Sequence, residues 1–256
     1  MANAFLYSDT DTVAVPEVPP VARRDRARAL LEVFLCSGVP SQLAIGYVLT
    51  LVGLAPFSAD GTPQATPLFA LALIDTLVVL ALVVLLLQAG GESVTPLMLG
   101  TRTVSRESVL GVLLVPILFV GVGVTVLVVR SLLPWSNNVP LNPFGEFLKT
   151  PRNAGLFAIV AIVAGGLREE VQRVFMLHRF ERYLGGATAG LVVVSVAFGA
   201  GHALQGWDAM IVTGLLGLTW GWIYLRRRSA VAPIVSHAGY NAAQIAQAIA
   251  LQGLRV

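Results

Sequence analysis

Apolar stretches of about 20 residues recur along this chain, and they constrain its fold more than any other feature. A helix of about that length crosses the hydrocarbon core of a bilayer. Only 12% of the 256 residues are charged and 56% are hydrophobic, whereas a soluble domain carries about 25% charged residues. Most of the outer surface must therefore face lipid. The candidate spans are residues 30–54, 66–88, 107–133, 153–183, 186–205, 208–226 and 230–251.

These spans predict an all-α polytopic membrane bundle of about seven helices, within a range of about six to eight. The first and third spans contain Pro40 and Pro116, where a helix can tilt or break. We expect residues 29–252 to form one transmembrane domain. Residues 1–28 hold prolines and an arginine cluster but no apolar run before a cleavage site. They predict a mobile cytoplasmic tail and not a signal peptide.

The basic residues are distributed unevenly between the two sides of these spans. With a cytoplasmic N-terminus, the outer ends hold Arg130, Lys149, Arg152 and Arg255, and the inner segments hold Arg23, Arg24, Arg26, Arg28, Arg102, Arg106, Arg168, Arg173, Arg179, Arg182, Arg226, Arg227 and Arg228. Cytoplasmic loops attract such an excess, so the C-terminus is expected outside. The net charge of +3 is then an orientation signal and does not indicate nucleic-acid binding. The single cysteine, Cys36, excludes an intrachain disulfide.

Three polar clusters with helical spacing interrupt the later apolar segments. They are Glu169-Glu170 with Arg173, Phe198 with His202, and His237 with Asn241. Residues three or four apart share one helix face, so each cluster can act as a unit. Carboxylates and imidazoles are costly inside a bilayer, and by default they mark a functional site there.

The fourth and fifth spans predict a helical hairpin that brings two of these clusters to one depth. Glu169 lies 16 residues before Gly185, and His202 lies 16 residues after Gly186. Both would be about 24 Å from the turn, at 1.5 Å per residue. Residues 187–201 are apolar, so this level is inside the bilayer. We expect His237 and Asn241, partway down the last span, to join one buried pocket that is most accessible from the cytoplasmic half.

Two chemical schemes fit this set, and both describe hydrolysis inside a membrane. In the first, Glu169, His202 and His237 hold Zn²⁺ with an open position for water. In the second, a glutamate and one histidine activate water directly, while the other histidine and an asparagine bind the oxyanion. An arginine-paired glutamate would keep its charge, and its desolvated neighbour would accept the proton. The candidate catalytic residues are Glu169, Glu170, Arg173, His202, His237 and Asn241.

Three further features are interpreted structurally. Asp75, alone in an apolar run, is expected to make a helix–helix hydrogen bond more than to form a second polar site. His178 is expected to be interfacial. The segment 134–152 has prolines, a Ser-Asn-Asn turn and aromatic residues, so we expect a linker with aromatic anchors more than a partly re-entrant cap.

The three clusters resemble the motifs of the CPBP family of intramembrane proteases, which includes the type 2 (Rce1-like) CAAX prenyl proteases and bacteriocin-processing relatives. That family carries Glu-Glu-x-x-x-Arg, Phe-x-x-x-His and His-x-x-x-Asn in this order, and here the resemblance covers roughly residues 150–245 as the catalytic core. The second and third motifs match in full, whereas Arg173 comes one residue early. Either Arg173 keeps its role after a modest rotation, or Glu169 is the second glutamate and Arg168 replaces the first. The former is favoured, with Glu169 as the base.

The resemblance implies an endopeptidase that cuts a membrane-anchored protein near its C-terminus or in a membrane-proximal segment. Arginine is abundant and Lys149 is the single lysine, which suggests a GC-rich bacterial genome. We therefore expect a multi-pass protein of the bacterial inner membrane, with a bacterial processing substrate in place of a prenylated one. The alternatives are a proton-coupled transporter, disfavoured by the lack of repeated broken helices, and an inactive scaffold or immunity member of the family.

Overall fold

The computed structural model describes residues 21–139 and 143–253, and within these ranges the chain is helical with no strand. The predicted all-α fold is confirmed. The elements are α1 (Arg23–Leu35), α2 (Val39–Leu51), α3 (Ala65–Ala89), α4 (Val94–Leu99), α5 (Val104–Leu132), α6 (Pro151–Val160), the π-helical segment η3 (Ala161–Arg168), α7 (Glu169–Tyr183), α8 (Ala187–Ala200), α9 (Trp207–Arg227) and α10 (Val231–Gly253). Of the predicted N-terminal tail, residues 1–20 lie outside the described ranges, and Arg23 begins α1.

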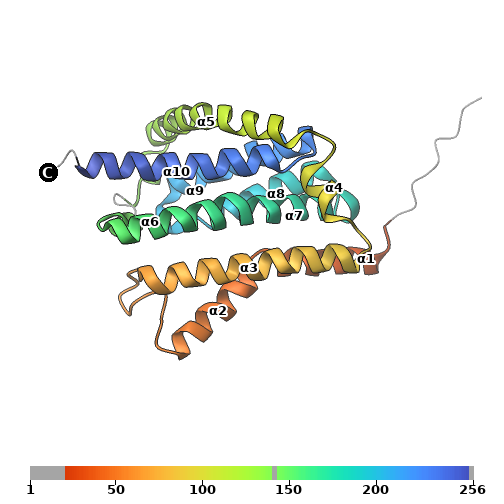
Figure 1. The fold of residues 1–256 in the computed structure, drawn as a ribbon, viewed down its shortest axis with the longest axis horizontal. Coiled ribbons are helices and arrows are strands. Elements are labelled where there is room, and N and C mark those ends of the chain that lie inside the picture. Colours follow the sequence, from red (N-terminus) through yellow and green to blue (C-terminus); the bar gives the residue numbers. More distant parts are fainter. Residues whose placement is uncertain (1–20, 140–142, 254–256) are drawn as a thin grey trace, which may run out of the picture.

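The helices run back and forth along one long axis (Figure 1). One end of the bundle, here called the α4 end, holds residues 90–103, 184–186 and 228–230. There Ala230 N–H donates to the Met98 carbonyl at 2.7 Å. The opposite end, here called the α6 end, holds residues 52–64, 133–139, 143–150 and 201–206, and Trp207 N–H donates to Asn138 Oδ1 at 2.9 Å. The described chain starts near the α4 end and finishes at the α6 end.

By length and hydropathy alone, three helices of the described chain can cross a membrane, namely α3, α5 and α9. The α1–α2 pair passes the same test together and bends by 41°. The helix breaks just before Pro40, where Gly38 takes a positive φ of 81°, while α5 continues through Pro116. The apolar α8 is shorter than a full span. The predicted count of seven spans stays a prediction, although the path of the chain follows the predicted segments.

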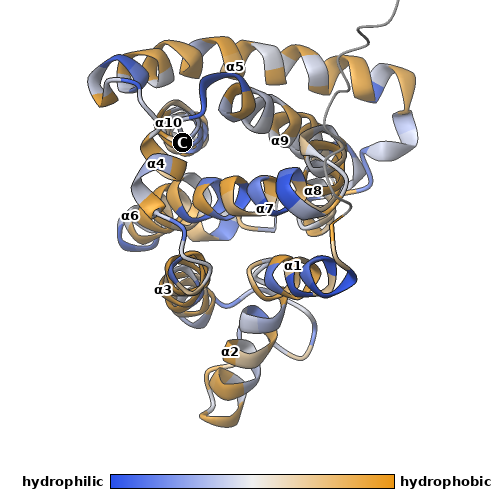
Figure 2. Ribbon diagram, turned by 90° about the vertical axis from the view of Figure 1, so that its right-hand side faces the viewer, coloured by the Kyte–Doolittle hydropathy of each residue, from blue (hydrophilic) through white to orange (hydrophobic). Residues whose placement is uncertain are grey.

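The surface and the interior have the polarity of a membrane protein. Large apolar side chains such as Leu43 and Leu127 are 69% and 68% exposed, while charged ones such as Glu107 and Arg179 are 1% exposed. Figure 2 shows the same contrast, with mostly apolar α3 and α5 on the outside and hydrophilic stretches on the central α7. Apolar groups that face outward are stable only against lipid, so the chain forms a membrane helical bundle.

The predicted hairpin is formed by α7 and α8. Gly185 and Gly186 both take positive φ values, 100° and 96°, which side-chain-bearing residues rarely adopt. The two helices pack along each other, and residues of both line one cavity in the interior. Glu169 and His202 both line this cavity, so they lie at one level of the bundle, as the residue spacing predicts.

An ionic cluster at the α4 end joins α7 to the turn that follows α3. Glu92 accepts hydrogen bonds from His178, from Arg179 at 2.5 Å and from Arg182 at 2.6 Å. His178 thus lies at an end of the bundle, as expected of an interfacial residue. Burial alone would raise the pKa of Glu92, but the His178 and Arg179 contacts outweigh it and lower this pKa to about 2.

This pairing predicts a loss of stability in acid. Because the folded-state pKa of Glu92 is depressed, the carboxylate stabilises the fold above its ordinary pKa of 4.5, and this contribution disappears as pH falls towards 2. We expect Glu92→Gln to unfold at lower temperature than the unchanged protein at pH 6, with the difference shrinking by pH 3. Thermal unfolding in detergent measures this, and a constant difference would contradict it.

Candidate active site

A buried ion pair occupies the centre of the bundle. The carboxylate of Glu170 accepts hydrogen bonds from Arg173 on the same helix and from His237 Nδ1 of α10 at 2.8 Å. These side chains are 1%, 2% and 5% exposed. Because a carboxylate only accepts, Nδ1 of His237 carries the hydrogen. Sequence spacing allows either glutamate to pair with Arg173, and the structure shows that Glu170 does.

His237 is also held by a stacking contact with α9. Its ring stacks on Trp220 with centroids 3.8 Å apart and an interplanar angle of 14°. The indole N–H of Trp220 donates to Ser236 Oγ at 3.1 Å, which fixes the ring beneath the imidazole. Trp220 is a site residue that the sequence analysis missed. A tryptophan inside an apolar span looks like core packing, and no spacing rule connects it to His237.

Glu169 lies beside this pair but faces open space. Its carboxylate is 23% exposed, and its Oε2 is 3.9 Å from Nε2 of His237, beyond direct hydrogen bonding. It lines a cavity of about 450 Å³ together with Arg173, Phe198 and His202. Glu169 is therefore the glutamate that a water molecule and a substrate can reach, whereas Glu170 is committed to its two partners.

His202 is oriented by the backbone of its own helix end. Its Nδ1 lies 2.9 Å from the carbonyl of Phe198, and since a carbonyl only accepts, Nδ1 carries the hydrogen. In the neutral ring Nε2 then has the lone pair. Phe198 separates the clusters, with its ring centroid 5.0 Å from that of His202 and 6.1 Å from that of His237. The guanidinium of Arg173 lies 4.4 Å above the same ring.

Asn241 anchors α10 to the π-helical segment that precedes the glutamates. Its Nδ2 donates to the Ala161 carbonyl at 2.9 Å. A π-helical turn in an α-helix is rare and occurs mostly at functional sites, and here it ends just before Glu169. Close approach requires glycine, because a Cβ on Gly165 would lie 2.6 Å from Asn241 Nδ2, and one on Gly166 would lie 2.5 Å from the Ala238 Cβ.

This contact gives a sharp prediction for Gly166→Ala. The new methyl group would also lie 2.8 Å from the Ala238 Cα, so backbone must move. We expect overpacking to destabilise the fold by about 1–3 kcal/mol and to lower activity by displacing His237. Gly155→Ala in α6, where nothing lies within 4 Å, is the control. Equal unfolding temperatures for the two variants would contradict the close approach.

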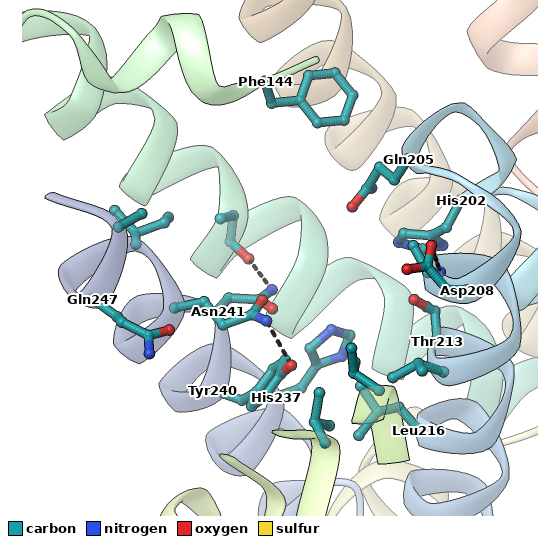
Figure 3. A pocket seen from close by; sticks show the side chains of 18 of the residues that line it. Phe144, His202, Gln205, Asp208, Thr213, Leu216, His237, Tyr240, Asn241 and Gln247 are labelled. Carbon is teal, nitrogen blue, oxygen red and sulfur yellow. Dashed lines mark hydrogen bonds between the residues drawn. The ribbon is translucent and has the colours of Figure 1, made fainter. Parts of the chain in front are cut away.

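Two cavities meet at Phe198 and His202. The first, of about 570 Å³, is lined by His202 and Gln205 on one side and His237 and Asn241 on the other (Figure 3). The second is the cavity of Glu169. Both also touch Phe144 of the 134–152 segment, and neighbouring Phe147 is 3% exposed. The aromatic anchors expected in this linker are present, because Phe144 and Phe147 both pack on Phe157 of α6, and its described residues 134–139 and 143–150 are here called the cap segment.

A second buried pair lies on the far side of Glu169. Arg168 donates to Asp75 at 2.6 Å and to Gln172 at 2.7 Å, and Asp75 also accepts from Ser41 and Gln42. Asp75 thus joins α2, α3 and η3, which is more than the single helix–helix hydrogen bond expected. Arg168 is thus the charge partner of Asp75.

The metal prediction finds no matching geometry. Within residues 21–139 and 143–253 no group of three or more His, Cys, Asp or Glu side chains is arranged to hold a metal ion. Glu169 lines one cavity and His237 the other, and the ring of Phe198 lies between His202 and His237. In this arrangement the three side chains are not grouped around one position, so zinc binding by Glu169, His202 and His237 stays a prediction.

A membrane helical bundle with a buried glutamate–histidine pair at its centre is the class of protein that this fold and site describe. Residues 151–243 match the family described as type II CAAX prenyl endopeptidase, Rce1-like. Over that segment the chain is similar to this family, which confirms the resemblance to the CPBP/CAAX proteases. No curated protein and no solved structure matches the chain.

Proposed function

We propose that this protein is an intramembrane endopeptidase that hydrolyses a peptide bond with water activated by Glu169. The observation that carries the proposal is the facing pair of Glu169 Oε2 and His237 Nε2, 3.9 Å apart. A water molecule between them can donate one hydrogen to each. Its oxygen lone pairs are then free to attack, and the family points to peptide cleavage as the reaction.

The steps follow from which atoms can accept a proton. Glu169 takes one proton from water as the oxygen bonds to the carbonyl carbon. The oxyanion that forms must accept hydrogen bonds. The amide nitrogen of Asn241 has two hydrogens, of which one is donated to the Ala161 carbonyl, and the other can be donated to the oxyanion. As the C–N bond breaks, Glu169 returns its proton to the nitrogen. The remaining hydroxyl proton passes to His237 Nε2, which leaves a carboxylate product.

The buried pair behind this centre acts by positioning. Glu170 holds the hydrogen of His237 on Nδ1 and therefore keeps the Nε2 lone pair towards Glu169. Arg173 carries the charge opposite to that of Glu170, so this buried pair adds no net charge beside the water. His202 adds an acceptor nitrogen where the two cavities meet.

Zinc held by Glu169, His202 and His237 stays the alternative prediction, and chelation separates the schemes. We expect purified protein treated with a strong zinc chelator to keep its full cleavage rate, because the proposed base is a carboxylate. The measurement is cleavage of a membrane-anchored reporter peptide before and after treatment, with added Zn²⁺ as the control. Loss of activity that Zn²⁺ restores would replace the glutamate scheme with the metal scheme.

The proposed substrate is a membrane-anchored protein or peptide, cut near its C-terminus or in its membrane-proximal segment. We place the protein in the bacterial inner membrane with the N-terminus in the cytoplasm. Arginines such as Arg102 and Arg227 gather at the α4 end, so that end would be cytoplasmic by the positive-inside rule. The α6 end and the C-terminus would then be extracytoplasmic.

A reconstituted assay tests the class of activity. The purified protein in liposomes should convert an anchored reporter peptide into two fragments whose masses sum to the substrate plus one water. Proton uptake driven by a gradient, without cleavage, would support the transporter alternative. Neither activity, with normal folding, would support the inactive scaffold or immunity alternative.

A further inference from the structure

The larger cavity is lined by side chains suited to a peptide backbone. Its amide groups come from Gln205 before α9 and from Asn241, Gln244 and Gln247 on α10, and Thr213 adds a hydroxyl (Figure 3). The volume of about 570 Å³ is in the range of ligand sites. Apolar positions of α5 and α9 line the rest of the wall.

A peptide must be extended to be cut, and extension frees its N–H and C=O groups. Inside a bilayer each unsatisfied group costs several kcal/mol. A primary amide both donates and accepts hydrogen bonds, so it can serve either backbone group. The amide-lined wall therefore fits an unwound polar segment better than an apolar helix.

This cavity reaches the α6 end of the bundle. Arg130 near the end of α5, Asp208 in the first turn of α9, and Val139 and Leu148 of the cap segment all line it. Arg130 and Asp208 pair at 2.7 Å, which leaves this region without net charge. Gln247, towards the end of α10, is exposed. The polar route to His237 and Asn241 thus starts at the end opposite to the arginine-rich α4 end.

The other cavity does not provide an equivalent path. Its wall is formed largely by apolar residues of α3 and α8, such as Leu68, Phe69 and Val194, and the Arg168–Asp75 pair bounds it. Its own amide side chains are already engaged, because Gln42 donates to Asp75 and Gln172 accepts from Arg168, while Gln205 is shared with the first cavity.

We infer that the substrate segment reaches the site from the extracytoplasmic side of the membrane, as an extended, polar and unmodified peptide lying along the amide-lined cavity. This inference rests on the proposed endopeptidase function. It assigns the substrate class as membrane proteins with a polar extracytoplasmic juxtamembrane segment. It differs from the expectation from sequence that the pocket is reached most easily from the cytoplasmic half, and the labelling experiment below distinguishes the two.

Cysteine labelling tests the side of access. The starting protein carries Cys36→Ala, because Cys36 is the single and fully buried cysteine. Three single cysteines are then introduced at exposed positions: Gln247→Cys in the cavity, Thr62→Cys at the α6 end outside it, and Thr101→Cys at the α4 end. Intact cells are treated with a membrane-impermeant maleimide, before and after permeabilisation.

We expect Gln247→Cys and Thr62→Cys to react in intact cells, and Thr101→Cys to react only after permeabilisation. A polar peptide with a non-cleavable bond should abolish labelling of Gln247→Cys and leave Thr62→Cys unchanged. Labelling of Thr101→Cys in intact cells, or no protection of Gln247→Cys, would overturn the inference. Reporter cleavage by the solubilised protein is measured in parallel, and its absence would overturn the proposed function instead.

Discussion

Glu169→Gln lowers the cleavage rate by about 10²–10⁴-fold, the usual cost of losing a general base. Glutamine keeps the size and hydrogen bonding of the side chain but does not take the proton of water. Because Glu169 is 23% exposed to its cavity and is not the partner of Arg173, we expect unchanged unfolding temperature. The measurement is single-turnover cleavage of the anchored reporter, with thermal unfolding of the same preparation.

Two further variants sharpen this result. Glu181→Gln on the same helix removes a carboxylate that pairs with Arg228 at the surface, and its activity should equal that of the unchanged protein. Combining Glu169→Gln with His202→Ala should be little worse than either change alone, because residues that act as one unit are not additive. Full activity in Glu169→Gln would exclude Glu169 as the base and move the role to another residue.

Arg173→Ala is expected to damage both stability and activity. Its guanidinium is the charge partner of Glu170 and lies above the Phe198 ring. Removing one member of a buried ion pair typically costs about 3–5 kcal/mol, because the other charge is left uncompensated. Glu170 would also hold His237 less firmly. Thermal unfolding and reporter cleavage measure the two effects.

The double variant Glu170→Gln with Arg173→Met separates folding from catalysis. Replacing both members of a buried pair is often nearly neutral for stability, so the unfolding temperature should recover. Activity should stay low, because the carboxylate that keeps the hydrogen on His237 Nδ1 is gone. Recovery of both properties would show that the pair serves folding alone and has no positioning role.

Periodicity and spacing predicted much of the fold. The long apolar runs become α3, α5 and α9, and the Gly185-Gly186 pair forms the predicted turn between α7 and α8. Such features are local, because span length depends on bilayer thickness and a glycine pair favours a turn wherever it lies. The break before Pro40 was also anticipated, whereas α4 was not, since its six residues carry no periodic signal.

The sequence by itself determined the residue types of the candidate site and their approximate level along the bundle. Helical spacing places residues on a face, and the hairpin length brings Glu169 and His202 to one level of the bundle. The sequence left open which glutamate pairs with Arg173, because Glu169 and Glu170 both lie within about one helical turn of Arg173.

Only the tertiary structure decided between them. Packing of α10 against η3 brings His237 to Glu170, stacks it on Trp220 and leaves Glu169 facing the cavity. The close approach depends on Gly165, Gly166 and a π-helical turn. Contacts between residues far apart in the chain arise from how helices rotate against one another. Spacing along one helix does not contain that rotation, so the folded chain was needed to identify Glu170 as the partner of Arg173 and His237.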